Sequence, residues 1–132
     1  MTSPVISVVD DDASVRRSLV RLIRSCGLAA EAFESAESYL DGPHDGDVAC
    51  VILDVHMQGM SGIELHEQLS KSPHHPPVII MTAHDDESTR QYVETHEVAG
   101  FLRKPFGART IVELVGGLLA SREGSNRVQP AA

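Results

Sequence analysis

The sequence from Ala49 to Leu53 is an unbroken apolar run that ends at a single acid, Asp54. Because polar and apolar residues do not alternate in it, the run predicts a strand that is buried on both faces, as in a parallel sheet. A second run of this kind, residues 78–81, ends at Thr82. A carboxylate at the end of a buried strand costs free energy unless it interacts with a cation, hydrogen-bond donors or water. Asp54 therefore needs partners from elsewhere in the chain.

Strand and helix patterns alternate along the whole chain. Apolar residues at helical spacing, such as Leu19 and Ile23, indicate helices between the strand-like runs. The expected strands are residues 5–9, 28–33, 49–53, 78–81 and 101–103, and the expected helices are residues 13–26, 35–40, 63–70, 86–97 and 108–122. Because crossovers between parallel strands are right-handed, this order predicts a single doubly wound α/β domain. We expect the domain to span residues 1–122, followed by a flexible tail or linker, residues 123–132.

Composition excludes several classes of function. A chain of 132 residues is the size of one domain, and its net charge of −8 argues against binding nucleic acid or an anionic membrane by itself. No apolar run approaches the roughly 20 residues that a membrane-spanning helix needs. Cys26 and Cys50 lie in apolar contexts without metal-ligand spacing, which predicts buried, reduced thiols in a cytoplasmic protein.

Polar residues follow four of the expected strands. Asp10–Asp12 follow the first strand, Asp54 the third, Thr82 the fourth and Lys104 the fifth. In doubly wound sheets, ligands bind at the carboxyl ends of the strands, where the strand order reverses. Carboxylates, a hydroxyl and an ammonium at this edge predict a site for a divalent cation and a phosphoryl group.

These residue types suit phosphoryl transfer to a carboxylate. Magnesium prefers hard oxygen ligands, so Asp11 and Asp54 can bind it directly while Asp10 holds a metal-bound water. An ionised Asp54 can attack phosphorus and form an aspartyl phosphate. The Lys104 ammonium and the Thr82 hydroxyl can then bind the phosphoryl oxygens.

Each feature alone also has a structural explanation. The acids after the first strand can cap a helix, with Asp12 as the N-cap. Threonine at a strand end is common, and Lys104-Pro105 is an ordinary loop dipeptide. Their occurrence together, at successive strand ends, favours the site over these separate explanations.

Five segments together resemble the receiver domain of two-component response regulators. They are VVDDD (8–12), ILDVHM (52–57), MSGIEL (60–65), MTA (81–83) and FLRKPF (101–106). The phrase VDDDASVRRSL, which begins at Val9, is similar to the FixJ group in particular. The resemblance implies a CheY-like sheet with strand order 2-1-3-4-5. In the FixJ group a helix-turn-helix DNA-binding domain follows the receiver, which implies an effector domain beyond residues 123–132.

The resemblance also implies roles for single residues. Asp54 would accept the phosphoryl group from a sensor histidine kinase. Mg²⁺ (or Mn²⁺) would be bound by Asp10, Asp11, Asp54 and the backbone carbonyl of His56. Thr82, Lys104 and the backbone N–H of Ala83 would bind the phosphoryl oxygens.

Further implications concern switching. Thr82 and the ring of Phe101 would move on phosphorylation, and the Lys104–Pro105 peptide bond would be cis. The face made by the fourth helix, fifth strand and fifth helix would then form a homodimer or free an effector that controls transcription. Such a protein is a phosphoryl-accepting switch with slow self-dephosphorylation, not an enzyme.

The chain also departs from the family pattern. Gln58 replaces the usual proline, which predicts a looser loop after Asp54. Residues 96–98, His-Glu-Val, replace Ala-Gly-Ala, which implies either a non-glycine residue at positive φ or a different helix end. His56 and His84 flank the path of the hydrolytic water in this family. They either make the phosphoryl lifetime depend on pH or are solvated loop residues.

Other interpretations stay open at this point. Arg17, Arg21 and Arg24 share one helix face, which is either a kinase-docking surface or a solvated face. An aspartate-nucleophile phosphohydrolase would use the same residue types, but His56 stands where such enzymes have a second acid. A docking module that works without phosphorylation is the third alternative, and the complete set of acids, Thr82 and Lys104 argues against it.

Overall fold

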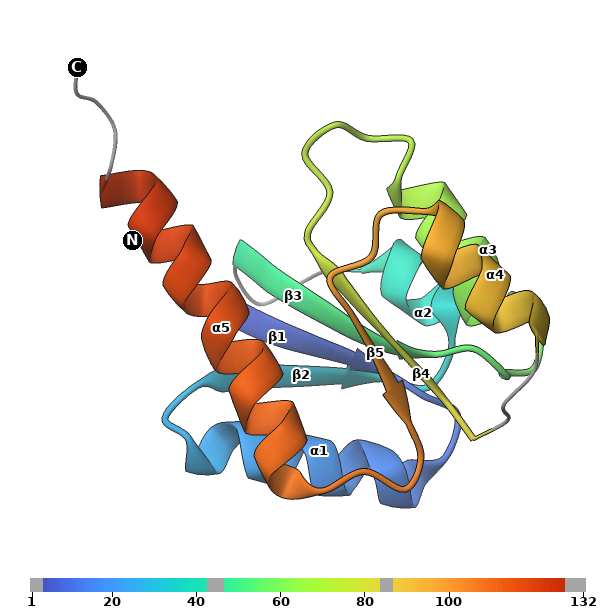
Figure 1. Ribbon diagram of the computed structural model, residues 1–132. Coiled ribbons are helices and arrows are strands. Elements are labelled where there is room, and N and C mark those ends of the chain that lie inside the picture. Colours follow the sequence, from blue (N-terminus) through green and yellow to red (C-terminus); the bar gives the residue numbers. More distant parts are fainter. Residues whose placement is uncertain (1–3, 43–46, 84–86, 128–132) are drawn as a thin grey trace.

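The computed structural model describes residues 4–42, 47–83 and 87–127. Strands and helices alternate along the chain, as the sequence predicts (Figure 1). The strands are β1 (Pro4–Val9), β2 (Ala29–Phe33), β3 (Asp47–Asp54), β4 (Val78–Thr82) and β5 (Gly100–Arg103). The helices are α1 (Ala13–Ser25), α2 (Ala36–Asp41), α3 (Gly62–Leu69), α4 (Glu87–Thr95) and α5 (Ala108–Arg127).

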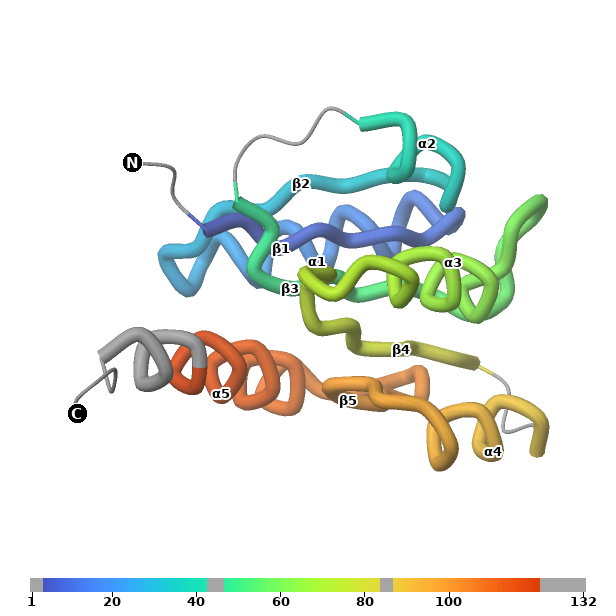
Figure 2. Tube along the Cα trace, turned by 90° about the horizontal axis from the view of Figure 1, so that it is seen from above, coloured from blue at the N-terminus to red at the C-terminus, as the bar shows by residue number. Residues whose placement is uncertain are grey.

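The five strands form one sheet in the order β2-β1-β3-β4-β5, and all neighbouring strands are parallel. This confirms the predicted doubly wound fold and its strand order. Helices α1 and α5 pack on one face of the sheet, and α2, α3 and α4 pack on the other. Seen from above, β3 and β4 run through the middle of the molecule (Figure 2). Asp54 therefore ends a central strand.

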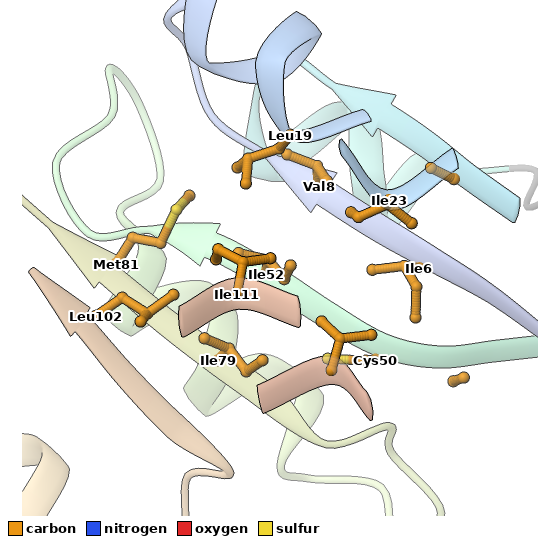
Figure 3. Close-up of a cluster of buried hydrophobic side chains, with 13 residues drawn as sticks. Ile6, Val8, Leu19, Ile23, Cys50, Ile52, Ile79, Met81, Leu102 and Ile111 are labelled. Carbon is orange, nitrogen blue, oxygen red and sulfur yellow. The ribbon is translucent and has the colours of Figure 1, made fainter. Parts of the chain in front are cut away.

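Two hydrophobic clusters, one on each face, explain the unbroken apolar runs. Ile52 belongs to the cluster under α1 and α5, whereas Leu53 belongs to the cluster under α2, α3 and α4. Both side chains are fully buried. Figure 3 shows the first cluster, in which side chains of β1, β3, β4 and β5 meet those of α1 and α5. Because successive side chains point to opposite faces and both faces are covered, no polar residue is needed along the strand.

Helix starts are set by side-chain caps. Asp12 accepts hydrogen bonds from the backbone N–H groups of Ser14 and Val15, so it caps α1 as one of the alternatives predicted. Ser61 caps α3 in a capping box with Glu64. The Ser61 cap places the start of α3 directly after the loop that leaves β3.

Several boundaries differ from the predicted ones. Strand β3 begins at Asp47, and α4 ends at Thr95, earlier than predicted. Helix α5 continues to Arg127, so the predicted boundary at residue 122 falls inside it and residues 123–127 are helical rather than a flexible tail. The predicted end was based on the last apolar residues at helical spacing, but the backbone hydrogen bonds of a helix can continue through polar residues. The remaining residues of the predicted tail lie outside the described part of the chain.

The prediction of two buried thiols is half wrong. Cys50 is fully buried, and burial raises the pKa of its thiol to about 12. Cys26 is exposed. Helix α1 ends at Ser25 and the chain then turns at Gly27, whose φ is 83°. This turn carries Cys26 away from the buried stripe that Leu19 and Ile23 form.

Among the described residues, no helix is both long enough and apolar enough to cross a bilayer.

Candidate functional site

The carboxyl edge of the sheet brings together side chains from three strands. Asp10, Asp54 and Lys104 each come two positions after a residue that packs under α1 and α5. Since strand side chains alternate, all three point toward that same side of the sheet. Asp11 joins them from the segment that leads into α1. The carboxylates of Asp10, Asp11 and Asp54, here called the acidic cluster, offer oxygen atoms that all lie within 4.8 Å of one another.

Lys104 supplies the positive charge at the acidic cluster. Its Nζ lies 2.8 Å from Oδ2 of Asp10 and 3.3 Å from Oδ1 of Asp54. The Lys104 backbone N–H donates to the carbonyl of Thr82, which ties the end of β5 to the end of β4. The Lys104–Pro105 peptide bond is cis, as the resemblance implied. Burial alone would lower the pKa of Lys104, but its hydrogen bond to Asp10 and the charges of Asp54 and Asp10 raise it above the usual value.

Asp54 is buried, and its pKa is raised to about 6. Burial is the largest cause, and the charges of Asp10 and Asp11 add to it, whereas Lys104 opposes it. Three carboxylates thus face one ammonium at this edge. An additional cation would lower the free energy of the ionised Asp54.

The acidic cluster fits a hard divalent cation. Asp10 is fully buried and both of its oxygens accept hydrogen bonds, Oδ1 from the N–H of Asp12 and Oδ2 from Lys104. Asp10 is therefore better suited to hold a metal-bound water than to bind the ion directly. Asp11 is exposed and Asp54 lies at the rim, so both can offer oxygen atoms to an ion on the solvent side. Such an oxygen set with room for water is what magnesium prefers.

The other predicted site residues lie around this cluster at different depths. Asp54 pairs with Met81 of β4, so Thr82 is one position further along the neighbouring strand, where it is fully buried. His56 and Ala83 follow the ends of β3 and β4 and are exposed. Phe101 is half-buried and packs against the cluster under α2, α3 and α4. His84 lies outside the described residues.

Glycine and acid residues that the sequence analysis did not single out also shape the site. A Cβ at Gly62 would lie 2.2 Å from the backbone oxygen of Asp54, so only glycine lets α3 begin this close to β3. The carboxylate of Glu37 accepts from the N–H of Met60 at 2.9 Å, which holds the loop between β3 and α3. The segment MSGIEL contained the signal for Gly62, whereas nothing local to Glu37 indicated its contact.

The arginine-rich face of α1 is partly engaged within the domain. Arg24 donates to the carbonyl of Ala30 at 3.2 Å, and Arg16 donates to the carbonyl of Asp10 at 2.7 Å. Arg17 and Arg21 are exposed. The Arg16 contact secures the backbone of the acidic cluster from the side of α1.

A doubly wound parallel sheet with an acidic cluster and a lysine at its carboxyl edge defines the class of α/β domains that bind a ligand where the strand order reverses. Residues 6–116 match the response regulator receiver domain, and the chain belongs to this family. Receiver domains are phosphorylation-controlled signalling switches that interact with sensor histidine kinases.

Individual relatives confirm the predicted FixJ-like character. The chain is 36% identical to the transcriptional regulatory protein FixJ of Azorhizobium caulinodans over 126 residues, which is 96% of this chain and 60% of that protein. The structure of FixJ-N superposes with a TM-score of 0.78 at 29% identity and covers 89% of this chain and 94% of that one. A receiver protein from Pseudoalteromonas atlantica gives a TM-score of 0.82 at 30% identity over 90% and 99% of the two chains. The chain thus spans less than two thirds of the length of its curated FixJ relative.

Proposed function

We propose that this receiver takes up a phosphoryl group on Asp54 from a sensor histidine kinase, in a magnesium-dependent reaction that controls transcription. One observation carries the proposal. Nζ of Lys104 lies between Asp10 and Asp54, at 2.8 and 3.3 Å, in a group of three carboxylates within 4.8 Å. This arrangement supplies a nucleophile, a cation for phosphoryl oxygens and ligands for a metal ion in one place.

Asp11, Asp54 and the backbone carbonyl of His56 would bind Mg²⁺ (or Mn²⁺) directly, and Asp10 would hold a water bound to the ion. When bound, the ion offsets the repulsion among the carboxylates and draws phosphoryl oxygens toward the site. Arg16 and the N–H of Asp12 keep Asp10 in place through its carbonyl and its carboxylate.

In the reaction, an Oδ atom of Asp54 attacks phosphorus, and an O–P bond forms as the P–N bond to the kinase histidine breaks. The electron pair of that bond returns to the imidazole. Lys104 and the Thr82 hydroxyl bind the phosphoryl oxygens, and the backbone N–H of Ala83 donates a further hydrogen bond. Lys104 moves from Asp54 to the phosphoryl group while it keeps its contact with Asp10.

Phosphorylation adds about −1.5 to −2 charges at this edge. Thr82 then moves toward the phosphoryl group and Phe101 turns inward behind it, which alters the face made by α4, β5 and α5. That face pairs with a second copy, and a DNA-binding effector beyond this chain responds in the cytoplasm. The longer FixJ relative, described as a transcriptional regulatory protein, supports this output.

Incubation with acetyl phosphate and Mg²⁺, followed by intact-mass measurement, tests the proposal. We expect one phosphoryl adduct, lost in Asp54→Asn and retained in Asp41→Asn, which changes an exposed acid at the end of α2. Rapid, continuous phosphate release would instead favour a phosphohydrolase. Partner binding that is identical in wild type and Asp54→Asn would favour the phosphorylation-independent docking module.

A further inference from the structure

A buried histidine joins helices α3 and α4 on the face of the sheet that they share (Figure 1). His66 of α3 is 2% exposed. Its Nδ1 lies 2.5 Å from the hydroxyl of Tyr92 in α4, and its Nε2 lies 3.2 Å from the backbone oxygen of Glu97, which follows α4. We call these three residues the His66 link. It takes no part in the acidic cluster.

The partners of the ring determine its tautomer. The backbone oxygen of Glu97 can only accept, so Nε2 of His66 carries the proton and donates. The Ser70 hydroxyl donates to the backbone oxygen of His66, which leaves its own oxygen free to accept weakly from Nε2 at 3.5 Å. Nδ1 of a neutral ring is then an acceptor, and the Tyr92 hydroxyl donates to it. All polar atoms of the His66 link are satisfied when the ring is neutral.

Helix α4 contributes fewer buried residues than any other helix of the described chain. Thr89 is the one fully buried residue that α4 contributes within the described chain, while Tyr92 and Val93 are partly buried. The burial of apolar surface therefore contributes little to holding α4 on the sheet. The two hydrogen bonds of one ring, Nδ1 accepting from Tyr92 of the helix and Nε2 donating to Glu97 in the turn behind it, fix where α4 lies and ends.

The surroundings of the ring disfavour its charged form. Burial is the main cause that lowers the pKa of His66, and His75 and His96 lower it further, against opposing effects of the Glu97 backbone and Glu67. The rings of His66 and His75 are 6.4 Å apart. On the α4 side, the Tyr92 ring meets His66 edge-on at 5.4 Å and stacks on His96 at 3.8 Å.

We propose that neutral His66 positions helix α4 on helix α3, and that protonation of the ring releases α4. A protonated Nδ1 can no longer accept from Tyr92, so that hydroxyl must reverse its hydrogen bond or lose it, and a cation is left buried. When α4 opens, the ring reaches water and takes up a proton at its usual pKa of about 6.5. Protonation therefore favours the open form increasingly as the pH falls below that value.

The consequence for signalling rests on the proposed function, because α4 belongs to the face that we expect to respond to phosphorylation. Release of α4 at low pH would make the switch respond to acidity as well as to the kinase. The positioning role itself stands on the geometry of the His66 link and does not require phosphorylation.

Amide hydrogen exchange of α4, corrected for intrinsic rates, measures the proposed release. For wild type we expect protection factors in α4 to fall about tenfold between pH 7.5 and pH 5.5, since one proton is taken up on opening. Tyr92→Phe removes the donor to Nδ1 and should lower protection at pH 7.5 by about fivefold, the equivalent of one hydrogen bond. His66→Gln can donate to Glu97 and accept from Tyr92, but it does not titrate. We expect it to keep protection within about twofold at pH 7.5 and to lose the pH dependence.

Matched controls come from the same chain. Tyr39→Phe removes the hydroxyl of the other tyrosine, and His74→Gln changes an exposed histidine in the loop before β4. Neither should change the protection of α4 or its pH dependence. Imidazole ¹⁵N spectra should show the Nε2–H tautomer for His66, with a pKa that rises toward the usual value in Tyr92→Phe.

Three results would overturn the proposal: an Nδ1–H tautomer, unchanged α4 protection in Tyr92→Phe, or a pH dependence that survives in His66→Gln. Binding of beryllofluoride with Mg²⁺, followed by amide shifts around Asp54, is measured on the same samples. Failure of that binding in wild type would count against the proposed function, while the exchange data would still decide the role of His66.

Discussion

Two buried carboxylates lie next to strand β1, Glu31 on the neighbouring strand β2 and Asp10 directly after the end of β1, and they differ in their partners. In the middle of the strand, Ser7 donates from its hydroxyl to Glu31 of β2 at 2.5 Å. Glu31 is 9% exposed, and Tyr39 packs near it, with its pKa raised to about 12 by burial and by the charge of Glu31. At the carboxyl end of the strand, Asp10 shares the Lys104 ammonium with Asp54.

The number of acids per partner separates these two regions. At Ser7, a single carboxylate accepts a hydrogen bond from a hydroxyl. The acidic cluster sets three carboxylates against one ammonium, which leaves excess negative charge in a partly desolvated place. Like charges clustered in this way are typical of a site that binds a cation or another ligand, whereas the single hydrogen bond between Ser7 and Glu31 joins two neighbouring strands.

The largest effect is expected when the Lys104 ammonium is removed. Lys104→Met leaves the acidic cluster without its ammonium, so we expect the free energy of unfolding at pH 7.5 to fall by about 3 kcal/mol, as for other broken buried pairs. Urea unfolding measures it, and added Mg²⁺ should restore part of the loss. Lys71→Met, at the chain's other lysine, changes an exposed residue and should have little effect. Similar losses in both variants would show that the Lys104 ammonium does not stabilise the acidic cluster.

Removing one negative charge should have the opposite sign. The pKa of Asp54 is raised to about 6 in the folded chain, so the folded state binds the proton more tightly than the unfolded state does. Stability is therefore lost as the pH rises from about 4 to about 6, and the loss is complete above that window. We expect Asp54→Asn to raise the free energy of unfolding by about 2 kcal/mol at pH 7.5. The gain should vanish near pH 4, and urea titrations at both pH values decide it.

The sequence predicts which residues lie at the carboxyl edge of the sheet, but not every contact that their side chains make there. Strand order along the chain and side-chain alternation were enough to bring Asp10, Asp54 and Lys104 to one edge. The direct contact of Lys104 with Asp10 was not predicted, because it joins residues 94 positions apart through side-chain conformations that no local pattern encodes. The same holds for His66, since neither its burial nor its contact with Tyr92 was predicted. The prediction for Cys26 was wrong for a local reason, because α1 ends at Ser25, one residue before Cys26 would have joined the apolar stripe.

Binding of Mg²⁺ to the acidic cluster should raise the free energy of unfolding, whereas the Ser7–Glu31 region should not contribute to this gain. At a free Mg²⁺ concentration ten times its Kd, the gain in unfolding free energy is about 1.4 kcal/mol. Asp11→Asn removes an exposed ligand and should abolish most of the gain, while Asp41→Asn should keep it. Thermal or urea unfolding with and without Mg²⁺ provides the measurement. An equal gain in both variants would place the ion elsewhere.

The smallest effect should come from the Ser7–Glu31 hydrogen bond. Ser7→Ala removes the hydroxyl donor to Glu31, and we expect a loss of about 1 kcal/mol, because Glu31 lies on edge strand β2 and keeps some access to water. The loss should not depend on Mg²⁺. Combining Ser7→Ala with Asp54→Asn should give additive changes within about 0.5 kcal/mol, since the Ser7–Glu31 hydrogen bond and the contacts of Lys104 with Asp10 and Asp54 have no residue in common. Combining Lys104→Met with Asp54→Asn should not, because both act on one contact and removal of the acid relieves part of the damage from losing the cation. If Ser7→Ala coupled to Asp54→Asn while Lys104→Met did not, the clustering of carboxylates around one ammonium would not be what separates a ligand site from a structural pair.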